Sequence, residues 1–363
     1  MAFITSIGTA VPENKFEQGT IARFMELLIT DEMQRRKMHA VFRSSSINTR
    51  HSVLSDYGKE NDFSFYSNNK NLEPFPSTAK RMHEYQKHAS QLSLKAIRNC
   101  INEASIKEIT HLITVSCTGM YAPGLDIDLV LSLQLPSSTE RICINFMGCY
   151  AAINALKVAN SICEANTNSK VLIVCTELCS LHFQKDFNED NILANALFAD
   201  GSAAMLVEAK PVSGVNLSIE NFQSEIVRSE EQHMAWSIGD LGFEMKLSSY
   251  VPAILEKGIH RLLQSLAEKT KIDLNQIQHF AIHPGGKKIL ETVAKELSLE
   301  TNKLAESFHV LRNFGNMSSP SVVFVLKELI NKFSFQNNNE FVVSMAFGPG
   351  LTMESMILKI HFL

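Results

Sequence analysis

Short apolar runs alternate with amphipathic stretches along this chain of 363 residues. The apolar runs are bounded by Gly, Pro or Asn, as buried strands usually are. They cover residues 111–117, 170–177, 203–209, 279–284, 340–348 and 352–360. Between them, apolar residues recur at helical spacing in 91–104, 155–165 and 251–270. This alternation predicts an α/β protein whose sheets are largely buried.

Two polar segments interrupt the pattern. Residues 56–78 are rich in Ser, Asn and Pro near their end, which predicts an exposed excursion. The run QNNNE at 336–340 predicts a tight surface turn.

An internal repeat emerges when the chain is compared with itself. Segment 108–119 resembles 276–286 at an offset of 168, and 145–159 resembles 313–329 at an offset near 167. The strand-like run at 170–178 aligns with 340–348 at about 170. Three matches in the same order at nearly constant offset predict a duplicated αβ unit. We place the two halves at residues 1–210 and 211–363.

Composition limits the class of protein. Hydrophobic residues make up 45% of the chain and charged residues 20%, which excludes a disordered chain. The net charge of −4 argues against nucleic acid or an anionic membrane as a partner. The longest apolar runs are too short to cross a bilayer, so we expect no membrane insertion.

The cysteine pattern indicates a reducing compartment. All seven cysteines fall within eighty residues, their number is odd, and no CxxC motif is present. The N-terminus lacks the features of a secretory signal. We therefore expect a cytoplasmic chain with free thiols.

Cys149 is the first candidate for chemistry. It follows a strand-like run that ends at Gly148 and precedes a helix of small residues. The positive end of a helix dipole favours a thiolate, and glycine leaves room for a reactant to approach. The alternative is that Cys149 is a buried packing residue, as most cytosolic cysteines are.

His283 and Asn316 are two further candidates. His283 ends a predicted strand before Pro284, where α/β proteins present functional side chains. Asn316 precedes a predicted helix at 319–329, where a capping role is the alternative. The repeat places Cys149 and Asn316 at nearly equivalent positions, so the three side chains are expected to meet between the halves as a Cys/His/Asn site.

The order Cys, His, Asn also fits a papain-like cysteine protease. In that family, however, the cysteine lies near the mature N-terminus in a C-G-[SA]-C-[WY] context. Cys149 lies mid-chain in GCYA, which disfavours this alternative.

Six motifs give the chain a family resemblance. They are GCYA (148–151), ALFADGSAA (196–204), IGDLGFEM (238–245), HPGGKKIL (283–290), GNMSSPSVVFVL (315–326) and AFGPGLTMES (346–355). The chain resembles the type III polyketide synthases, the chalcone-synthase-like branch of the thiolase superfamily. The resemblance runs from about residue 4 to the C-terminus. It implies a five-layered αβαβα thiolase-like fold and a homodimer.

The resemblance also implies a reaction. Cys149 would carry an acyl group taken from an acyl-CoA starter, while His283 and Asn316 would assist decarboxylation of malonyl-CoA. Repeated condensation and cyclisation would give a resorcinol, pyrone or related product. No metal or redox cofactor is implied, and the CoA thioesters are substrates.

Pocket residues follow from the same motifs. Phe198 and Met245 match the two gatekeepers of the family, the second of which is usually Phe. Cys117, Cys179 and His182 match pocket-lining positions that are commonly Thr in plant enzymes, a pattern more like bacterial alkylresorcinol or alkylpyrone synthases. These departures favour a long aliphatic starter over a cinnamoyl-type one. Further substrate-binding candidates are Ser318, Gly285, Gly286 and, in the basic segment 35–51 that would meet CoA, Lys37 and Arg43.

Two related alternatives remain, a ketoacyl-ACP synthase of the third kind and a catalytically silent subunit, and the residues disfavour both. HPGG and GNMSS separate the chain from ketoacyl-ACP synthases of the third kind, whose histidine is typically followed by Gln-Ala-Asn. A catalytically silent partner subunit is disfavoured because Cys149, His283 and Asn316 are all present.

Overall fold

The computed structural model describes residues 1–363, with every side chain except those of Lys70 and Thr301. The strands are β1 (Phe3–Ala10), β2 (Asn14–Glu17), β3 (Thr49–Ser52), β4 (His111–Ser116), β5 (Glu140–Asn145), β6 (Lys170–Leu178), β7 (Asp200–Glu208), β8 (Val215–Ile226), β9 (Met234–Gly239), β10 (Gly242–Leu247), β11 (Ile277–Ile282), β12 (Phe341–Gly348) and β13 (Thr352–Phe362). The helices are α1 (Gln18–Glu26), α2 (Glu32–Ser44), α3 (Thr78–Cys100), α4 (Glu103–Ile106), α5 (Leu125–Leu133), α6 (Ala151–Ala165), α7 (Glu189–Leu197), α8 (Val251–Thr270), α9 (Lys287–Glu296), α10 (Ala305–Phe314) and α11 (Ser319–Ile330).

The predicted repeat is visible in the strand order. In the described chain, hydrogen bonds connect the strands in the order β11-β12-β13-β8-β1-β7-β6-β4-β5. β4 pairs with β6 in parallel, as β11 does with β12, and both β6–β7 and β12–β13 are antiparallel. The two halves meet where Phe3 and Ile4 of β1 pair with Ser218 and Leu217 of β8. Each half therefore repeats the same four-strand pattern.

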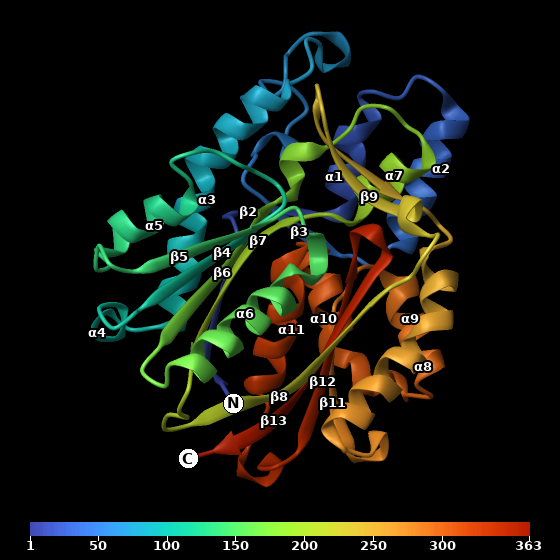
Figure 1. Ribbon diagram of the computed structural model, residues 1–363. Helices are drawn as coiled ribbons and strands as arrows, with labels where there is room; N and C mark the ends of the chain where they lie inside the picture. Colours follow the sequence, from blue (N-terminus) through green and yellow to red (C-terminus); the bar gives the residue numbers. More distant parts are fainter.

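The layers follow from three separate hydrophobic clusters. One cluster lies between α3 and the outer face of the N-terminal strands, and another lies between α8 and the C-terminal strands. The third cluster contains α6 and α11 together with the inner faces of both sets of strands. Figure 1 shows this succession, from α3 through α6 and α11 to α8. The predicted αβαβα arrangement is confirmed.

Burial explains why the middle and outer helices differ in sequence. Residues 319–326 of α11 are all buried, because this helix is covered by strands on both sides. α3 buries only one face and carries Lys, Arg and His on the other. A helix that is apolar all round belongs in an interior layer, whereas an amphipathic one covers a surface.

Most predicted elements are present with shifted ends. The prediction 251–270 coincides with α8, whereas the prediction 91–104 is wrong at both ends, because α3 spans Thr78–Cys100. The first turns of α3 are mostly polar, so hydrophobic periodicity does not reveal them. Ser77 caps this helix by accepting a hydrogen bond from the Lys80 amide.

The prediction that residues 56–78 form an exposed excursion holds for residues such as 60–62 and 68–69 but is wrong for the segment as a whole. Tyr57, Phe65, Tyr66 and Phe75 are buried there, in an aromatic cluster with residues of α1 and of the β6–α7 connection. The carboxylate of Asp56 accepts hydrogen bonds from the amides of residues 64–66 and fixes the loop. Aromatic rings at irregular spacing produce this burial without a periodic signal.

The connection between β7 and β8 contains the predicted boundary at 210/211. As a division into two units, this boundary stays a prediction. Within the described residues, no helix is both long and apolar enough to span a membrane.

Candidate active site

Cys149 lies in a single 3-10 turn, Gly148–Tyr150, which leads directly into α6. Gly148 has φ +76°, and a Cβ at this position would lie 2.4 Å from Cδ of Pro349. Both the left-handed backbone and the close approach of Pro349 require glycine here. The thiol is therefore held at a helix N-terminus, as predicted.

His283 directly follows β11. Its backbone N–H donates to the Met345 carbonyl oxygen at 2.8 Å, which continues the pairing of β11 with β12. The side chain is 1% exposed, and within the described residues neither ring nitrogen has a hydrogen-bond partner. Buried polar atoms are normally paired, so two unpaired nitrogens on one ring indicate that His283 can form hydrogen bonds with a ligand.

Asn316 is held by both halves of the chain. Its N–H donates to the Leu197 carbonyl oxygen, and its carbonyl oxygen accepts from the Ala199 amide, each at 2.9 Å. The side-chain oxygen Oδ1 accepts from the Ser318 amide at 2.8 Å. Nδ2 donates to the Gly285 carbonyl oxygen at 3.2 Å, and its second hydrogen can serve the Cys149 thiol or a ligand.

One cavity of about 30 Å³, the central cavity, brings the three predicted residues together. The sequence-predicted residues that line it are Cys117, Cys149, Cys179, Phe198, Met245, His283, Gly285, Asn316 and Ser318. The thiol comes from the N-terminal half, whereas the imidazole and the amide come from the C-terminal half. The structure thus places a thiol, an imidazole and an amide at the seam between the halves.

Burial sets the charge state of the thiol and the imidazole. It raises the pKa of Cys149 to about 12, while hydrogen bonds from Ser318 and Asn316 act in the opposite direction. Burial also lowers the pKa of His283 to about 3. In both groups burial favours the uncharged form, and it therefore opposes the thiolate that the helix N-terminus was predicted to favour.

Glu177 is a buried carboxylate of this site that sequence reasoning missed. It accepts hydrogen bonds from the Cys117 amide (2.9 Å), the Thr118 hydroxyl (2.7 Å) and the Ser319 hydroxyl (2.7 Å). Burial raises its own pKa, and its negative charge contributes to the raised pKa of Cys149. A charged residue inside the apolar run of β6 is the signal that could have identified it.

The predicted lining residues divide between two cavities. Cys117 lies in the central cavity, where its Sγ is 3.4 Å from the Ser318 hydroxyl oxygen. Cys179, Phe198 and Met245, together with Trp236, also line a second cavity of about 40 Å³. We call this second cavity the rear chamber. The shared residues form the partition between the two cavities.

His182 lines the rear chamber instead of the central cavity. Nε2 lies 2.7 Å from the Thr118 carbonyl oxygen, and Nδ1 accepts from the Phe243 amide at 2.9 Å. The ring also stacks on Phe243 at 4.3 Å. His182 therefore attaches β10 to the core, in contrast to the unpaired His283.

A third cavity of about 300 Å³, the entrance pocket, adjoins the central cavity through Leu247, Gly285 and Ile289. Gly286 and Lys37 line it, as do Lys287 and Lys288, which sequence reasoning did not select. Lys37 forms an exposed ion pair with Glu189, with 2.6 Å between Nζ and Oε1. Arg43 does not belong to this pocket and lines a separate depression beside Phe42 and Asn48.

Comparisons with known proteins agree with this architecture. Residues 1–211 match the N-terminal domain of the chalcone and stilbene synthases, and residues 218–361 match the C-terminal domain. The chain is 30% identical to the alpha-pyrone synthesis polyketide synthase-like protein Pks18 of Mycobacterium tuberculosis, covering 99% of this chain and 91% of that protein. It is also 30% identical to the probable polyketide synthase 1 of Dictyostelium discoideum, over 99% of this chain but only 11% of that much longer protein.

Solved structures give the same result. The C-terminal type III polyketide synthase domain of Steely1 from Dictyostelium is 27% identical, with a TM-score of 0.89 and 99% of each chain covered. A polyketide synthase of the brown alga Ectocarpus siliculosus is 26% identical, with a TM-score of 0.90 and coverage of 99% and 98%.

The chain belongs to the chalcone and stilbene synthase family, which comprises the type III polyketide synthases. It is therefore a condensing acyltransferase with the thiolase fold. This membership removes the papain-like alternative.

Proposed function

We propose that the protein condenses malonyl-CoA with an acyl-CoA starter that is held as a thioester on Cys149. The observation that carries this proposal is the central cavity, in which a thiol, an imidazole with two unpaired nitrogens and an oriented amide converge. In a cysteine hydrolase of the Cys/His/Asn type the amide would orient the imidazole, but the Asn316 side chain is bonded to Gly285 and Ser318 and not to the His283 ring. The amide donor is suited to an enolate oxygen.

The first step is transfer of the acyl group. His283 takes the proton of the Cys149 thiol as Sγ attacks the thioester carbonyl carbon. The bond between that carbon and the CoA sulfur breaks, and the departing CoA thiolate takes the proton from His283. The neutral resting state of His283 is the form that can accept this proton.

Condensation follows in the same cavity. The bond from the malonyl carboxylate to the adjacent carbon breaks, CO₂ leaves, and the electron pair forms a thioester enolate. The enolate oxygen accepts hydrogen bonds from the His283 ring and from Asn316 Nδ2. The enolate carbon then attacks the acyl carbon, and the Cys149 thiolate leaves. The product is a CoA thioester extended by two carbons.

The test is mass spectrometry of the products formed from malonyl-CoA and a panel of starters. Extended products with every reactive starter, together with CO₂ release, are the expected result. Hydrolysis of acyl-CoA with no carbon–carbon bond formed would contradict the proposal. The same spectra distinguish resorcinols from pyrones by the extra carboxyl carbon that a pyrone retains.

The preferred starter is an elongated aliphatic chain. Met245 replaces the usual aromatic gatekeeper, and the rear chamber behind the partition has Ile21, Met25 and Ala194 in its walls. A flexible gatekeeper and aliphatic walls favour an unbranched chain over a planar ring. We expect dodecanoyl-CoA to be extended faster than acetyl-CoA or benzoyl-CoA; faster turnover of benzoyl-CoA would contradict this expectation.

CoA enters through the entrance pocket. Lys37, Lys287 and Lys288 supply local positive charge to an otherwise acidic protein, as anionic phosphates require. The proposed steps use only the thiol, the imidazole and the amide, so no cofactor takes part. Dialysis against EDTA is expected to leave activity unchanged.

The active form is a homodimer in the cytoplasm. In the described chain β5 is an edge strand that pairs with β4 alone, and all its residues are exposed or half-buried. An unpaired edge can continue a sheet into a second copy. Sedimentation is expected to give about twice the chain mass of 40.6 kDa. The free state of all seven cysteines, each in the described chain, supports the assignment to the cytoplasm.

A further inference from the structure

Arg50, in β3, is a buried arginine with one unused nitrogen. The side chain is 4% exposed. Nε donates to Gln18 Oε1 at 2.9 Å, and Nη1 donates to the carbonyl oxygens of Asn195 (2.8 Å) and Phe198 (2.6 Å). Nη2 is buried and, within the described residues, has no hydrogen-bond partner. Every acceptor of this guanidinium is therefore a neutral amide or carbonyl oxygen.

The charge of Arg50 is poorly compensated. Burial lowers its pKa to about 10, which still leaves it charged at neutral pH. Asp200 acts on Arg50 electrostatically, but its carboxylate is occupied by the Ser180 amide (2.7 Å), the Ser180 hydroxyl (2.6 Å) and the Val53 amide (2.8 Å). An anionic ligand stabilises a buried cation with a free N–H more than a neutral ligand does.

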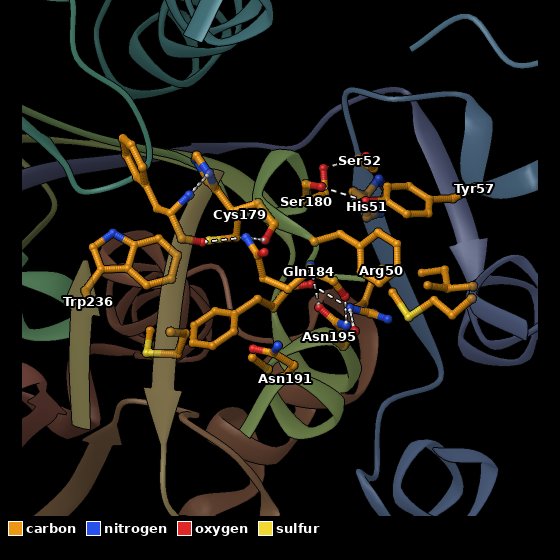
Figure 2. Close-up of a pocket in the computed structure, with 18 residues that line it drawn as sticks. Arg50, His51, Ser52, Tyr57, Cys179, Ser180, Gln184, Asn191, Asn195 and Trp236 are labelled. Carbon is orange, nitrogen blue, oxygen red and sulfur yellow. Dashed lines mark hydrogen bonds between the residues drawn. The ribbon is translucent and has the colours of Figure 1, made fainter. Parts of the chain in front are cut away.

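Arg50 lines the rear chamber. In the view of Figure 2, Trp236 of the partition and Arg50 lie toward opposite ends of this chamber, with Gln184 and Asn195 between them. An acyl chain on Cys149 that passes between Phe198 and Met245 would enter the chamber from the partition. Because Nη1 is bonded to the Phe198 carbonyl oxygen, the guanidinium is attached to the partition backbone, and the end of such a chain would meet it inside the chamber.

Arg81 provides a comparison within the same chain. It is 0% exposed, its Nη2 also has no partner among the described residues, and it donates to the Pro76 and Leu181 carbonyl oxygens. The rings of Phe65 and Phe75 lie 6.0 and 5.1 Å from its guanidinium carbon, and the ring of Phe42 lies 5.7 Å from that of Arg50, so aromatic faces contact both cations. Arg81 does not line the rear chamber. Of the two, Arg50 alone faces a space that substrate can reach.

We propose that Arg50 determines starter specificity: its Nη2 binds the distal end of the acyl chain and selects starters that end in a carboxylate. The substrate class is thus the CoA monothioesters of aliphatic dicarboxylic acids. This inference rests on the condensing function proposed above. The polar end is fixed at Arg50, the thioester is fixed at Cys149, and the length of the chain is selected by the distance between them.

The first test uses the unmodified protein. Malonyl-CoA is supplied with matched pairs of starters of six, eight and ten carbons: the CoA monothioester of the dicarboxylic acid, and the simple acyl-CoA. We expect kcat/KM to be about tenfold to a hundredfold higher for the carboxylate at the best length, the range of a hydrogen bond to a charged group. Equal or lower values for the carboxylate at all three lengths would overturn the proposal, as would equal values for an ω-hydroxyacyl-CoA.

The second test changes the arginine. Arg50→Met is expected to abolish the preference, and Arg50→Lys to retain part of it, because a cation stays near the chamber. The control is Arg81→Met, which removes an equally buried arginine and should leave the ratio of the two kcat/KM values as in the wild type. An unchanged ratio in Arg50→Met would refute the role.

The experiment also separates the two proposals. If Arg50→Met does not fold, the wild-type ratio and Arg50→Lys decide the question. If both kinds of starter are extended without discrimination, only the role of Arg50 fails. If no starter of any kind is extended, the condensing function itself fails.

Discussion

Helices α6 and α11 occupy equivalent places in the two halves, but the turns before them carry different chemistry. The turn before α6 presents Cys149, and the turn before α11 presents Asn316 and Ser318. The first turn reaches positive φ with Gly148 at +76°, whereas the second does so with Ser318 at +57°. Duplication therefore supplied two helix N-termini facing one cavity, and only one of them received a nucleophile.

The non-glycine turn is held by hydrogen bonds. Such a backbone conformation costs on the order of 1–3 kcal/mol for a residue with a side chain. The Met317 amide donates to the Ser321 hydroxyl at 2.7 Å, and the Ser318 amide donates to Asn316 Oδ1 at 2.8 Å. The hydrogen bond that orients the Asn316 side-chain amide is therefore donated by the strained residue Ser318. The turn at Gly148 is shaped by the close approach of Pro349, and the turn at Ser318 is shaped by hydrogen bonds.

The equivalent strand ends differ in the same way. Cys117, which follows β4, is bonded through both its amide and its thiol to Glu177. His283, which follows β11, has two ring nitrogens with no partner among the described residues. The polar groups of Cys117 are hydrogen-bonded without a ligand, whereas the ring nitrogens of His283 are not. We therefore assign a structural role to Cys117 and a catalytic role to His283.

Replacing the nucleophile should have the largest effect. Cys149→Ala removes the acyl carrier, and we expect polyketide formation to fall by at least about 10³-fold, measured by mass spectrometry of products. Cys100→Ala is the matched control, a buried cysteine in α3 that should retain activity. Adding Ser318→Cys to Cys149→Ala should not restore products. Recovery in that double variant would show that the two turns are interchangeable.

Changes in the C-terminal half should slow one step. Asn316→Ala removes a donor to the enolate and His283→Gln replaces the ring with an amide whose donor lies elsewhere, and we expect malonyl-CoA decarboxylation to fall by about 10²–10³-fold in each. Release of labelled CO₂ measures this step directly. His260→Gln, an exposed histidine of α8, serves as the control. Normal CO₂ release in both variants would mean that their roles are misassigned.

Removing the charge of Glu177 should make Cys149 more reactive. The negative charge of Glu177 disfavours a nearby thiolate, so Glu177→Gln should lower the pKa of Cys149. We expect several-fold faster alkylation of Cys149 by iodoacetamide at pH 8, with mass spectrometry of the labelled peptide as the measurement. Glu208→Gln, a buried carboxylate paired with Lys170, is the control. Slower labelling in Glu177→Gln would contradict the expected decrease in the pKa of Cys149.

The two buried histidines predict a pH dependence of stability. Burial lowers the pKa of both His182 and His283 to about 3, so they stay neutral in the folded state where the unfolded chain binds protons. Their contribution is complete above about pH 6.5 and is lost as pH falls toward 3, by roughly 1.4 kcal/mol per pH unit for each histidine.

Asp200 acts in the opposite direction. Its pKa is raised by burial from 3.8 to about 6, so its contribution to stability is lost as pH rises between these two values.

Denaturant unfolding at several pH values measures the histidine effect. The free energy of unfolding should change less steeply with pH in His283→Gln than in the wild type. An identical slope in the variant would mean that His283 is charged in the folded protein.

The family resemblance predicted the layers, whereas periodicity and the repeat predicted individual helices and the proposed reacting trio. Strong periodicity predicted α8 at its observed ends, and the repeat brought Cys149, His283 and Asn316 to one seam. Glu177 was missed because it lies within the apolar run of β6, where a pattern shows burial but not what a buried charge contacts.

The rear chamber could not be read from the sequence either. Arg50 belongs to a basic segment, and its burial depends on Gln18, Asn195 and Phe198, which are distant in sequence. Whether one nitrogen of a guanidinium stays unpaired is decided by tertiary contacts. The same holds for the aromatic rings of residues 56–78, whose partners lie in other elements.

The backbone bridge between Phe198 and Asn316 has a mechanical consequence. Because the amide and carbonyl of Asn316 are bonded to Leu197 and Ala199, the main chain of the partition and that of the enolate donor form a single rigid link. The Phe198 ring can rotate to admit a chain while the donor stays in place. A displacement of the Phe198 backbone, however, would withdraw the amide at the same moment. The proposed passage of an acyl chain would therefore be a side-chain event, and mutations that loosen this link should uncouple filling of the rear chamber from catalysis.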